Sequence, residues 1–414
     1  RLSARHAKPA SVSPIRSDPQ LRLRARRAAP GARRAGAEQA AQLEQLRREL
    51  LDFYRSWGYQ LIQPPFIEYL DSLLTGTGHD LDLQTFKLID QLSGRLLGLR
   101  ADMTPQAARI DAHRLQRQAP SRLCYLGTVL RTLPDGFAGS RSPMQVGAEL
   151  FGHAGAESDV EILELMVATL ALCGVEDVYI DLGHVGIYRG LAQDAGLEPE
   201  QEALLFEALQ RKAIPEINEF LLQLDLSTAQ RERLAGLATL NGGVDVLERA
   251  QALLQGSGDG VQSALENLGR IAGLAQRRLP QLSLHFDLAE LRGYQFHTGA
   301  VFAAFVADRG QEIARGGRYD EIGKVFGRAR PATGFSTDLR TLMQLGRRGR
   351  PQAVGAILAP FEDNAALSDK VRALRAEGEA VIQQLPGQAG SVAETGCDRV
   401  LRWNGSEWVV ESIT

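Results

Sequence analysis

Two glycine- and arginine-containing segments interrupt apolar, strand-like runs between positions 282 and 336. The first, at 292–299, reads RGYQFHTG, and the second, at 316–320, reads GGRYD. Glycine lets the main chain come close to a ligand, and arginine offers a planar fork of donors for a carboxylate or a phosphate. The two segments therefore predict strands of an antiparallel sheet that form the floor of a pocket for an anionic metabolite.

The rest of the pattern agrees with such a sheet. Leu43, Leu46 and Leu50 recur at helical spacing and predict a buried helix face. Short β-like runs at 84–89, 96–100, 123–130 and 144–151 are mostly joined by short turns and bordered by helices. Thr104 is expected to cap a helix that starts at Pro105. We predict an α+β core over residues 40–346, with an antiparallel sheet rather than a doubly wound parallel one.

Two further regions differ from this core. Residues 190–276 read as helices alone, which predicts a helical insertion, because strand-like runs resume at 282–286. Residues 352–414 predict a small C-terminal α/β domain that ends in a hairpin, since Asn404-Gly405 suits a type I′ turn. Residues 1–39 are rich in Arg, Ala, Pro and Ser and predict a disordered or atypical leader, with a transit-like segment as the alternative.

Charge, cysteine content and hydropathy exclude several classes of function. The net charge is −3, yet residues 1–39 contain nine arginines and one lysine against Asp18 and Glu38. The remainder is acidic, which makes it a poor candidate for gripping nucleic-acid phosphates. The three cysteines are scattered and have no metal-ligand spacing, so we expect no metal site, no disulfide framework and a cytoplasmic location. No run of eighteen apolar residues exists, so we expect no membrane span.

Polar residues at strand positions indicate what the pocket holds. Asp102 and Thr104 lie at a predicted strand-to-helix junction, and Gln145 and Glu149 have the spacing of one strand face. A carboxylate on the inner face of a strand is costly unless it is paired. Arg292 supplies the matching positive charge. This combination suits a zwitterion such as an amino acid.

From about residue 40 to 345 the chain resembles the catalytic core of histidyl-tRNA synthetases. The segments at 292–299 and 316–320 resemble the two histidine-specific signatures of that family. Residues 58–65, 129–145 and 331–335 resemble its three class II motifs, in order. The resemblance implies a class II aminoacyl-tRNA synthetase-like antiparallel sheet flanked by helices, and self-association as a dimer.

The departures from the synthetase pattern lie at positions that bind ATP in the synthetases. Leu133 stands where the second motif has a glutamate, and Thr341 stands where the third has an arginine. Gly139 replaces an arginine of the basic loop between Arg131 and Arg141. Phosphate clamping is what adenylation requires, so these changes argue against that reaction. The C-terminal domain is also shorter and less basic than the usual anticodon-binding domain.

A synthetase-like fold with a retained histidine pocket resembles the regulatory subunits of ATP phosphoribosyltransferase. The runs at 181–189, 290–299 and 330–339 look like those of that family. The resemblance implies a non-catalytic, cytoplasmic protein of histidine biosynthesis that activates the short-form catalytic subunit in a hetero-octamer. It also implies feedback inhibition through bound L-histidine, no cofactor in this chain, and Mg²⁺ at the catalytic partner.

The resemblance also assigns roles to individual residues. Arg292 would hold the histidine carboxylate, and Asp102, Thr104 and Gln145 would hold its ammonium group. Glu149 and Tyr319 would shape the imidazole side, where His297 replaces a tyrosine of the synthetases. The expected histidine-binding set is Asp102, Thr104, Arg131, Gln145, Glu149, Arg292, His297 and Tyr319.

Two alternatives stay open at this stage. The chain could be an authentic histidyl-tRNA synthetase, which histidine-dependent ATP–pyrophosphate exchange would reveal. It could also be a histidine-sensing synthetase paralogue that works on another partner. One scaffold carries many functions, so fold alone does not separate these readings.

Overall fold

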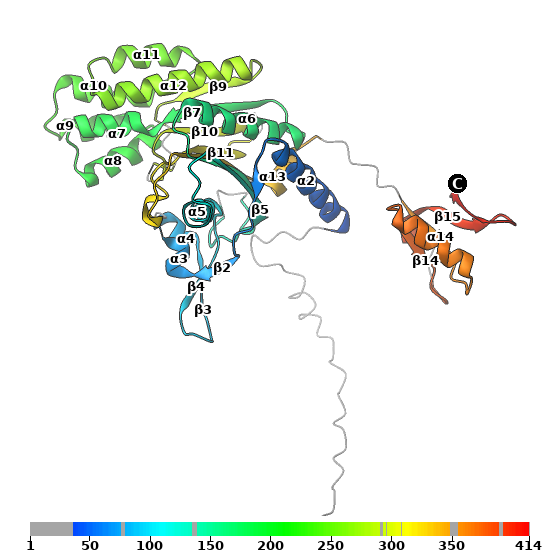
Figure 1. Ribbon diagram of the computed structural model, residues 1–414. Helices are drawn as coiled ribbons and strands as arrows, with labels where there is room; N and C mark the ends of the chain where they lie inside the picture. Colours follow the sequence, from blue (N-terminus) through cyan, green and yellow to red (C-terminus); the bar gives the residue numbers. More distant parts are fainter. Residues whose placement is uncertain are drawn as a thin grey trace, which may run out of the picture. The chain divides into compact units, whose positions relative to one another are not determined.

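The computed structural model describes residues 36–75, 79–134, 139–289, 293–294, 296–307, 309–347, 355–388 and 392–413. These residues form two compact units that divide after Arg347. The larger unit runs from blue to yellow in Figure 1, and the smaller one is orange and red. Each unit has its own sheet and its own hydrophobic core. Within the described ranges, no helix combines the length and the apolar character needed to cross a bilayer.

A nine-stranded sheet organises the larger unit. Its strands in spatial order are β1 (Gln60–Leu61), β5 (Ser121–Thr128), β6 (Met144–Phe151), β12 (Ala332–Asp338), β11 (Ala314–Arg318), β10 (Ala300–Val306), β7 (Val178–His184), β9 (Ser283–Asp287) and β8 (Asn241–Gly242). The six strands from β5 to β7 pair antiparallel, as the sequence predicted. The pairs β1–β5 and β7–β9 are parallel, because long connections join these strands.

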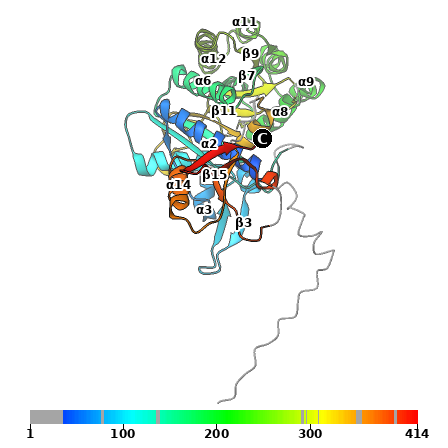
Figure 2. The ribbon, with the colours of Figure 1, turned by 90° about the vertical axis from the view of Figure 1, so that its right-hand side faces the viewer.

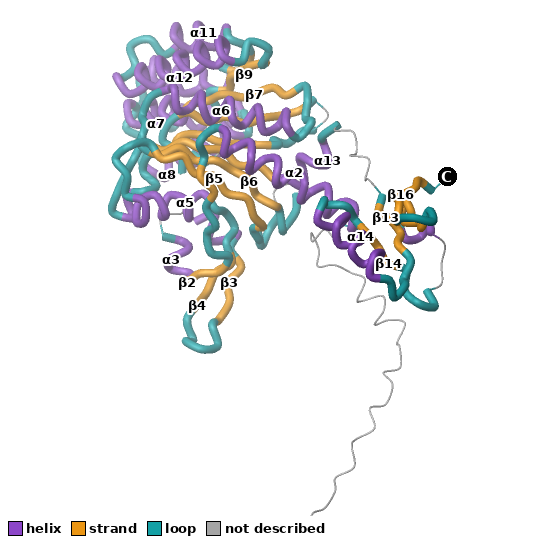
Figure 3. The backbone as a smooth tube through the Cα atoms, turned by 45° about the vertical axis from the view of Figure 1, so that its right-hand side comes forward, coloured by secondary structure: helices purple, strands orange, loops and turns teal. Residues whose placement is uncertain are grey.

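Helices α2 (Ala37–Ser56), α6 (Ala156–Leu172) and α13 (Leu339–Leu345) lie along one side of the sheet (Figure 3). The predicted leucine stripe of α2 is buried there, and Tyr54 Oη lies 3.0 Å from Thr169 Oγ1 of α6. Alternate residues of β5 and β6, such as Cys124 and Val146, point to this side and pack against the helices. The remaining residues of these strands therefore point to the opposite face, where the polar positions Gln145 and Glu149 lie.

The connection from β7 to β9 is the predicted helical insertion, grouped at the top of Figure 2. It contains α7 (Val185–Asp194), α8 (Pro199–Gln210), α9 (Ile214–Leu222), α10 (Thr228–Gly236), the 3₁₀ turn η2 (Leu237–Thr239), α11 (Asp245–Leu253) and α12 (Asp259–Arg278). His184 caps α7, since its Nδ1 accepts from Gly186 N at 3.1 Å. The expectation of helices alone was wrong in one place, because β8 joins the sheet beside β9. A strand of two residues is too short to show the alternation of apolar and polar side chains by which strands are predicted.

A second, three-stranded sheet has the order β2 (Ile67–Tyr69), β4 (Leu96–Leu99) and β3 (Phe86–Ile89). Around it lie α3 (Leu70–Leu74), α4 (His79–Gln84), α5 (Thr104–Ile110) and the π-helical turn η1 (Asp111–Leu115), with η3 (Lys324–Phe326) farther along the chain. The prediction that Thr104 caps α5 was wrong. Met103 is the N-cap, and Thr104 N donates to Asp102 Oδ1 at 2.9 Å. The Asp102 carboxylate thus takes the role that a capping hydroxyl would have had.

The smaller unit is a four-stranded sheet with the order β14 (Val381–Gln383), β13 (Ala356–Ala359), β15 (Cys397–Trp403) and β16 (Trp408–Ser412). Helix α14 (Ala365–Ala376) and the turn η4 (Val392–Thr395) complete it. The predicted hairpin is present, but its loop is longer than a two-residue type I′ turn. Asn404 N donates to Glu407 O, and the Asn404 side chain accepts from Ser406 N and Glu407 N. These bonds stabilise a four-residue loop instead.

Candidate functional site

A cavity of about 480 Å³ opens over the sheet face that carries Glu149. This volume lies within the range of ~300–1,000 Å³ that small-molecule sites occupy. Six residues of the predicted histidine-binding set line it: Asp102, Thr104, Arg131, Glu149, His297 and Tyr319. Gln145 lies beside them on the wall of an adjoining cavity. Arg292 lies outside the described residues.

Asp102 and Gln145 form one wall through mutual hydrogen bonds. Gln145 Nε2 donates to Asp102 Oδ1 at 2.8 Å, and Gln145 Oε1 accepts from Met103 N at 3.0 Å. These bonds fix the orientation of the Asp102 carboxylate and of the Gln145 side-chain amide. No described residue hydrogen-bonds Asp102 Oδ2, and the side chain lines the cavity. Asp102 therefore offers an oriented carboxylate oxygen to a cationic group.

Glu149 lies at the bottom of the cavity and is almost completely buried. Tyr125 Oη donates to its Oε1 at 2.8 Å, and Tyr319 Oη donates to its Oε2. Burial raises the pKa of Glu149 well above its ordinary value, despite these donors. Burial therefore favours the protonated form of this carboxyl group, which can donate one proton and still accept hydrogen bonds.

Tyr125 is a site residue that the sequence interpretation missed. It is fully buried on β5, and its hydroxyl lies 2.9 Å from Thr104 Oγ1 and 2.8 Å from Glu149 Oε1. The strand opposite has Gly147 at this register, and a Cβ there would lie 2.5 Å from Tyr125 Oη. A glycine inside a strand often marks such a close approach, so Gly147 was the available signal.

The imidazole of His297 is held between two glycines of the signature segments. A Cβ on Gly293 would lie 2.8 Å from His297 Cδ2, and a Cβ on Gly317 would lie 2.8 Å from Nδ1. Nδ1 is 3.3 Å from the carbonyl oxygen of Arg318. A carbonyl only accepts, so Nδ1 carries the proton and Nε2 is an acceptor. Burial lowers the pKa of His297 to about 4, which keeps the ring neutral at neutral pH.

Aromatic rings close the same side of the cavity. The Phe296 ring lies 5.0 Å from that of Tyr319 and 5.5 Å from that of His297, measured between centroids. Such tilted and edge-on pairs are favourable arrangements of aromatic quadrupoles. Together with the buried Glu149 carboxyl, they make an apolar compartment with a few oriented hydrogen-bonding groups.

The lining of the adjoining cavity, of about 360 Å³, includes Arg131, Gly139 and Thr341. Arg131 lines both cavities, and burial lowers its pKa. Thr341 donates to Asp338 Oδ2 at 2.9 Å, and the side chain of Leu133 is largely exposed. Neither residue offers the charge or the hydrogen bonds that its synthetase counterpart would contribute.

Two protein-family models match this chain, one over most of the larger unit and one over the smaller unit. Residues 31–342 match the family model described as histidyl-tRNA synthetase. Residues 354–411 match the model described as the ATP phosphoribosyltransferase subunit HisZ C-terminal domain. The two matches together span most of the described chain.

Curated relatives share most of the length. The chain is 61% identical over 375 residues to an ATP phosphoribosyltransferase regulatory subunit of Thioalkalivibrio sulfidiphilus, with 90% of this chain and 95% of that protein covered. It is 59% identical over 377 residues to one of Alkalilimnicola ehrlichii, with 90% and 94% covered.

A solved structure is similar as well. It is described as an ATP phosphoribosyltransferase regulatory subunit/histidyl-tRNA synthetase from Bacillus halodurans, and it is 29% identical with a TM-score of 0.77. The alignment covers 88% of this chain and 94% of that one. The predicted class II synthetase-like fold is thereby confirmed.

Proposed function

The chain belongs to the family of ATP phosphoribosyltransferase regulatory subunits, and from that premise we propose that it senses L-histidine. It is a regulatory subunit of the first enzyme of histidine biosynthesis and not the catalytic one. Bound histidine would lower the activity of the assembled enzyme by favouring an inhibited quaternary state.

The observation that carries this proposal is the buried Glu149 carboxyl at the base of the cavity, held by the hydroxyls of Tyr125 and Tyr319, with Asp102 on the cavity wall. A neutral imidazole has one donor and one acceptor, and a carboxyl group whose pKa is raised by burial can exchange hydrogen bonds with either of them. Asp102 Oδ2 is available for the ammonium group, with Gln145 holding the carboxylate in orientation. These features support a zwitterion whose side chain is a small polar ring.

The carboxylate of the ligand requires a cation. The resemblance assigns this role to Arg292, whose position in the sequence directly precedes Gly293 on the cavity wall. Arg131 lines the same cavity and provides a second guanidinium. A planar fork of donors suits a carboxylate better than a single ammonium does.

The proposal extends to the assembly. The chain would dimerise and join a short-form catalytic subunit as a hetero-octamer with four copies of each, in the cytoplasm. Mg²⁺ would act at the catalytic partner. Exposed apolar side chains on and beside the β3–β4 hairpin support an association surface: Leu88, Ile89, Leu92 and Leu96.

Calorimetric titration of the chain with histidine and with histidinol tests the ligand. Histidinol keeps the imidazole and the amine but lacks the carboxylate, so we expect binding of histidine and at least about tenfold weaker binding of histidinol. Equal affinities would exclude carboxylate recognition, and no binding of either would refute the proposed ligand. Histidine-dependent ATP–pyrophosphate exchange by the same preparation would instead favour synthetase activity.

A further inference from the structure

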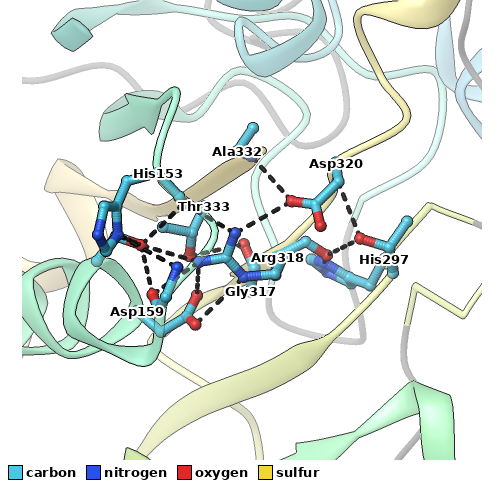
Figure 4. Close-up of polar contacts among 11 residues, drawn as sticks. His153, Asp159, His297, Gly317, Arg318, Asp320, Ala332 and Thr333 are labelled. Atoms are coloured by element: carbon cyan, nitrogen blue, oxygen red, sulfur yellow. Dashed lines mark hydrogen bonds and ion pairs between the residues drawn. The ribbon is translucent and has the colours of Figure 1, made fainter. Parts of the chain in front are cut away.

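Arg318, the last residue of β11, lies beneath the cavity wall and makes an unusually complete set of hydrogen bonds (Figure 4). Its guanidinium bonds two carboxylates, a hydroxyl and two backbone carbonyls: Asp159 Oδ2 (3.2 Å), Asp320 Oδ1 (3.1 Å), Ser158 Oγ (2.9 Å), His153 O (3.1 Å) and Gly155 O (3.3 Å). Five N–H groups in a fixed planar arrangement make this possible, and lysine cannot reproduce it.

The pair between Arg318 and Asp159 is deeply buried, with side chains 7% and 1% exposed. Asp159 lies in the first turn of α6, so the pair fixes the start of that helix to the end of β11. Burial raises the pKa of Asp159, and the Arg318 charge opposes that effect. A buried charge without its partner is costly, so the position of each group depends on the other.

The backbone of Arg318 connects this anchor to the cavity. Its carbonyl oxygen accepts from Thr298 N at 2.7 Å and faces His297 Nδ1 at 3.3 Å. The next residue, Tyr319, donates to Glu149 and packs against Phe296 with its ring tilted. Asp320 continues the connection, because Ala332 N donates to its Oδ1 at 2.9 Å.

The packing of Arg318 also explains the glycine at position 299, the last residue of the first signature segment. A Cβ on Gly299 would lie 2.9 Å from Arg318 Cδ and 3.1 Å from its Cβ. The absence of a side chain at 299 therefore leaves room for the stem of Arg318. Gly293 and Gly317 thus make room for the ring of His297, and Gly299 makes room for the stem of Arg318.

We infer that Arg318 is a positioning residue for the ligand pocket, which acts by fixing the ring of His297 and the hydroxyl of Tyr319. It lies outside the cavity lining, and Asp159 on α6 holds it in place. The ligand-binding part of this inference rests on the proposed histidine function. The positioning part concerns the pocket itself and needs no ligand.

Arg318→Lys tests the inference, and Arg330→Lys is its matched control. Arg330 is also a buried arginine paired with a buried aspartate, Asp111, and neither lines the cavity. Both variants remove a buried arginine–aspartate ion pair, so we expect similar losses of thermal stability. Arg318→Lys should weaken histidine binding at least about tenfold, whereas Arg330→Lys should stay within about twofold of the wild type. Equal affinities in the two variants would overturn the inference.

A second readout works without any ligand. Nitrogen chemical shifts of ¹⁵N-labelled histidine report which ring nitrogen of His297 carries the proton, and a His297→Gln variant assigns the signal. We expect a single Nδ1–H form in the wild type and in Arg330→Lys, and a changed or mixed pattern in Arg318→Lys. Unchanged His297 shifts in Arg318→Lys would contradict the inference, whether or not histidine binds.

Asp159→Asn changes the ion-pair partner of Arg318 and is a milder substitution. It tests the inference if Arg318→Lys does not fold. The amide has nearly the same shape as the carboxylate but lacks its charge. We expect the same direction of change in the His297 signals and in histidine affinity. In the double variant the effects should be less than additive, because the two groups act as one unit. Wild-type His297 shifts in Asp159→Asn would count against the inference.

Discussion

At the scale of single residues, Glu149 shows how the fold controls a charge. Its side chain is surrounded by Tyr125, Tyr319 and the sheet, where water cannot solvate an anion. The folded state therefore favours the protonated form, and this preference is linked to stability. The same linkage makes the assignment testable without a ligand.

The first prediction concerns Glu149→Gln. Because the folded-state pKa of Glu149 is raised above its ordinary value of 4.5, the unfolded chain releases this proton first as pH rises. The wild type should lose stability relative to Glu149→Gln above about pH 4.5, by up to ~1.4 kcal/mol per pH unit until the folded carboxyl ionises. Chemical denaturation of both proteins between about pH 5 and pH 8 measures the difference. A pH-independent difference would show that Glu149 is already ionised in the fold.

The second prediction concerns Gly334→Ala. A Cβ at Gly334 would overlap Glu149 Oε2 and lie 2.8 Å from Ala148 O, so the carboxyl must move. We expect a loss of about 1–3 kcal/mol in unfolding free energy and a weaker affinity for histidine. Gly269→Ala in α12 is the control, since nothing lies within 4 Å of its added methyl. Alanine is the better helix former there, so that variant should be as stable as the wild type or more so. Normal histidine binding by Gly334→Ala would contradict the assigned place of Glu149.

Some of this residue-level arrangement could be predicted from sequence and some could not. The spacing of Gln145 and Glu149 correctly placed both on one strand face, because the period of a strand is two. Tyr125 and Asp159 were not predicted, since their partners are distant in sequence and only the folded sheet brings them together. Their contribution to ligand binding, like that of the predicted set, stays a prediction.

At the scale of elements, side-chain caps fix the starts of α7, α10, α13 and α14. His184, Ser227, Asp338 and Asn364 each accept a hydrogen bond from a backbone amide of the helix they precede. Such a bond satisfies one of the amides that have no partner in the first turn. Asn364 is a useful case because it lies in the smaller unit.

Asn364→Ala should lower the stability of the smaller unit by about 1 kcal/mol, because Leu367 N loses its acceptor at 3.1 Å. Hydrogen exchange read by mass spectrometry measures this, and it should show faster exchange in α14. Asp369→Ala in the same helix removes only an exposed ion pair with Arg372 and should have little effect. Equal exchange in both variants would show that the cap contributes nothing.

The long, periodic elements were predictable from sequence, whereas the short ones were not. Helix α2 and strands β5 and β6 follow clear apolar spacing, and the structure contains them. The one-turn helices α3 and α4 and the strand β8 are too short to show a period. They form because neighbouring elements supply their contacts and hydrogen bonds.

At the scale of the whole molecule, the larger unit supplies the cavity. Every described residue that lines the cavity belongs to this unit, which has its own core. A chain that ends at Arg347 should therefore bind histidine within about twofold of the full chain's affinity. Calorimetry on both chains measures this. A folded but non-binding truncated chain would show that the smaller unit contributes to the site.

The measurement that decides most directly is phosphoribosyl-ATP formation by a short-form catalytic subunit, with and without this chain, across a histidine titration. We expect strong activation by the chain and progressive reversal of that activation by histidine. Activation that histidine leaves unchanged would contradict the sensing role of the pocket. No activation by the folded chain would contradict the proposed partnership with a short-form catalytic subunit.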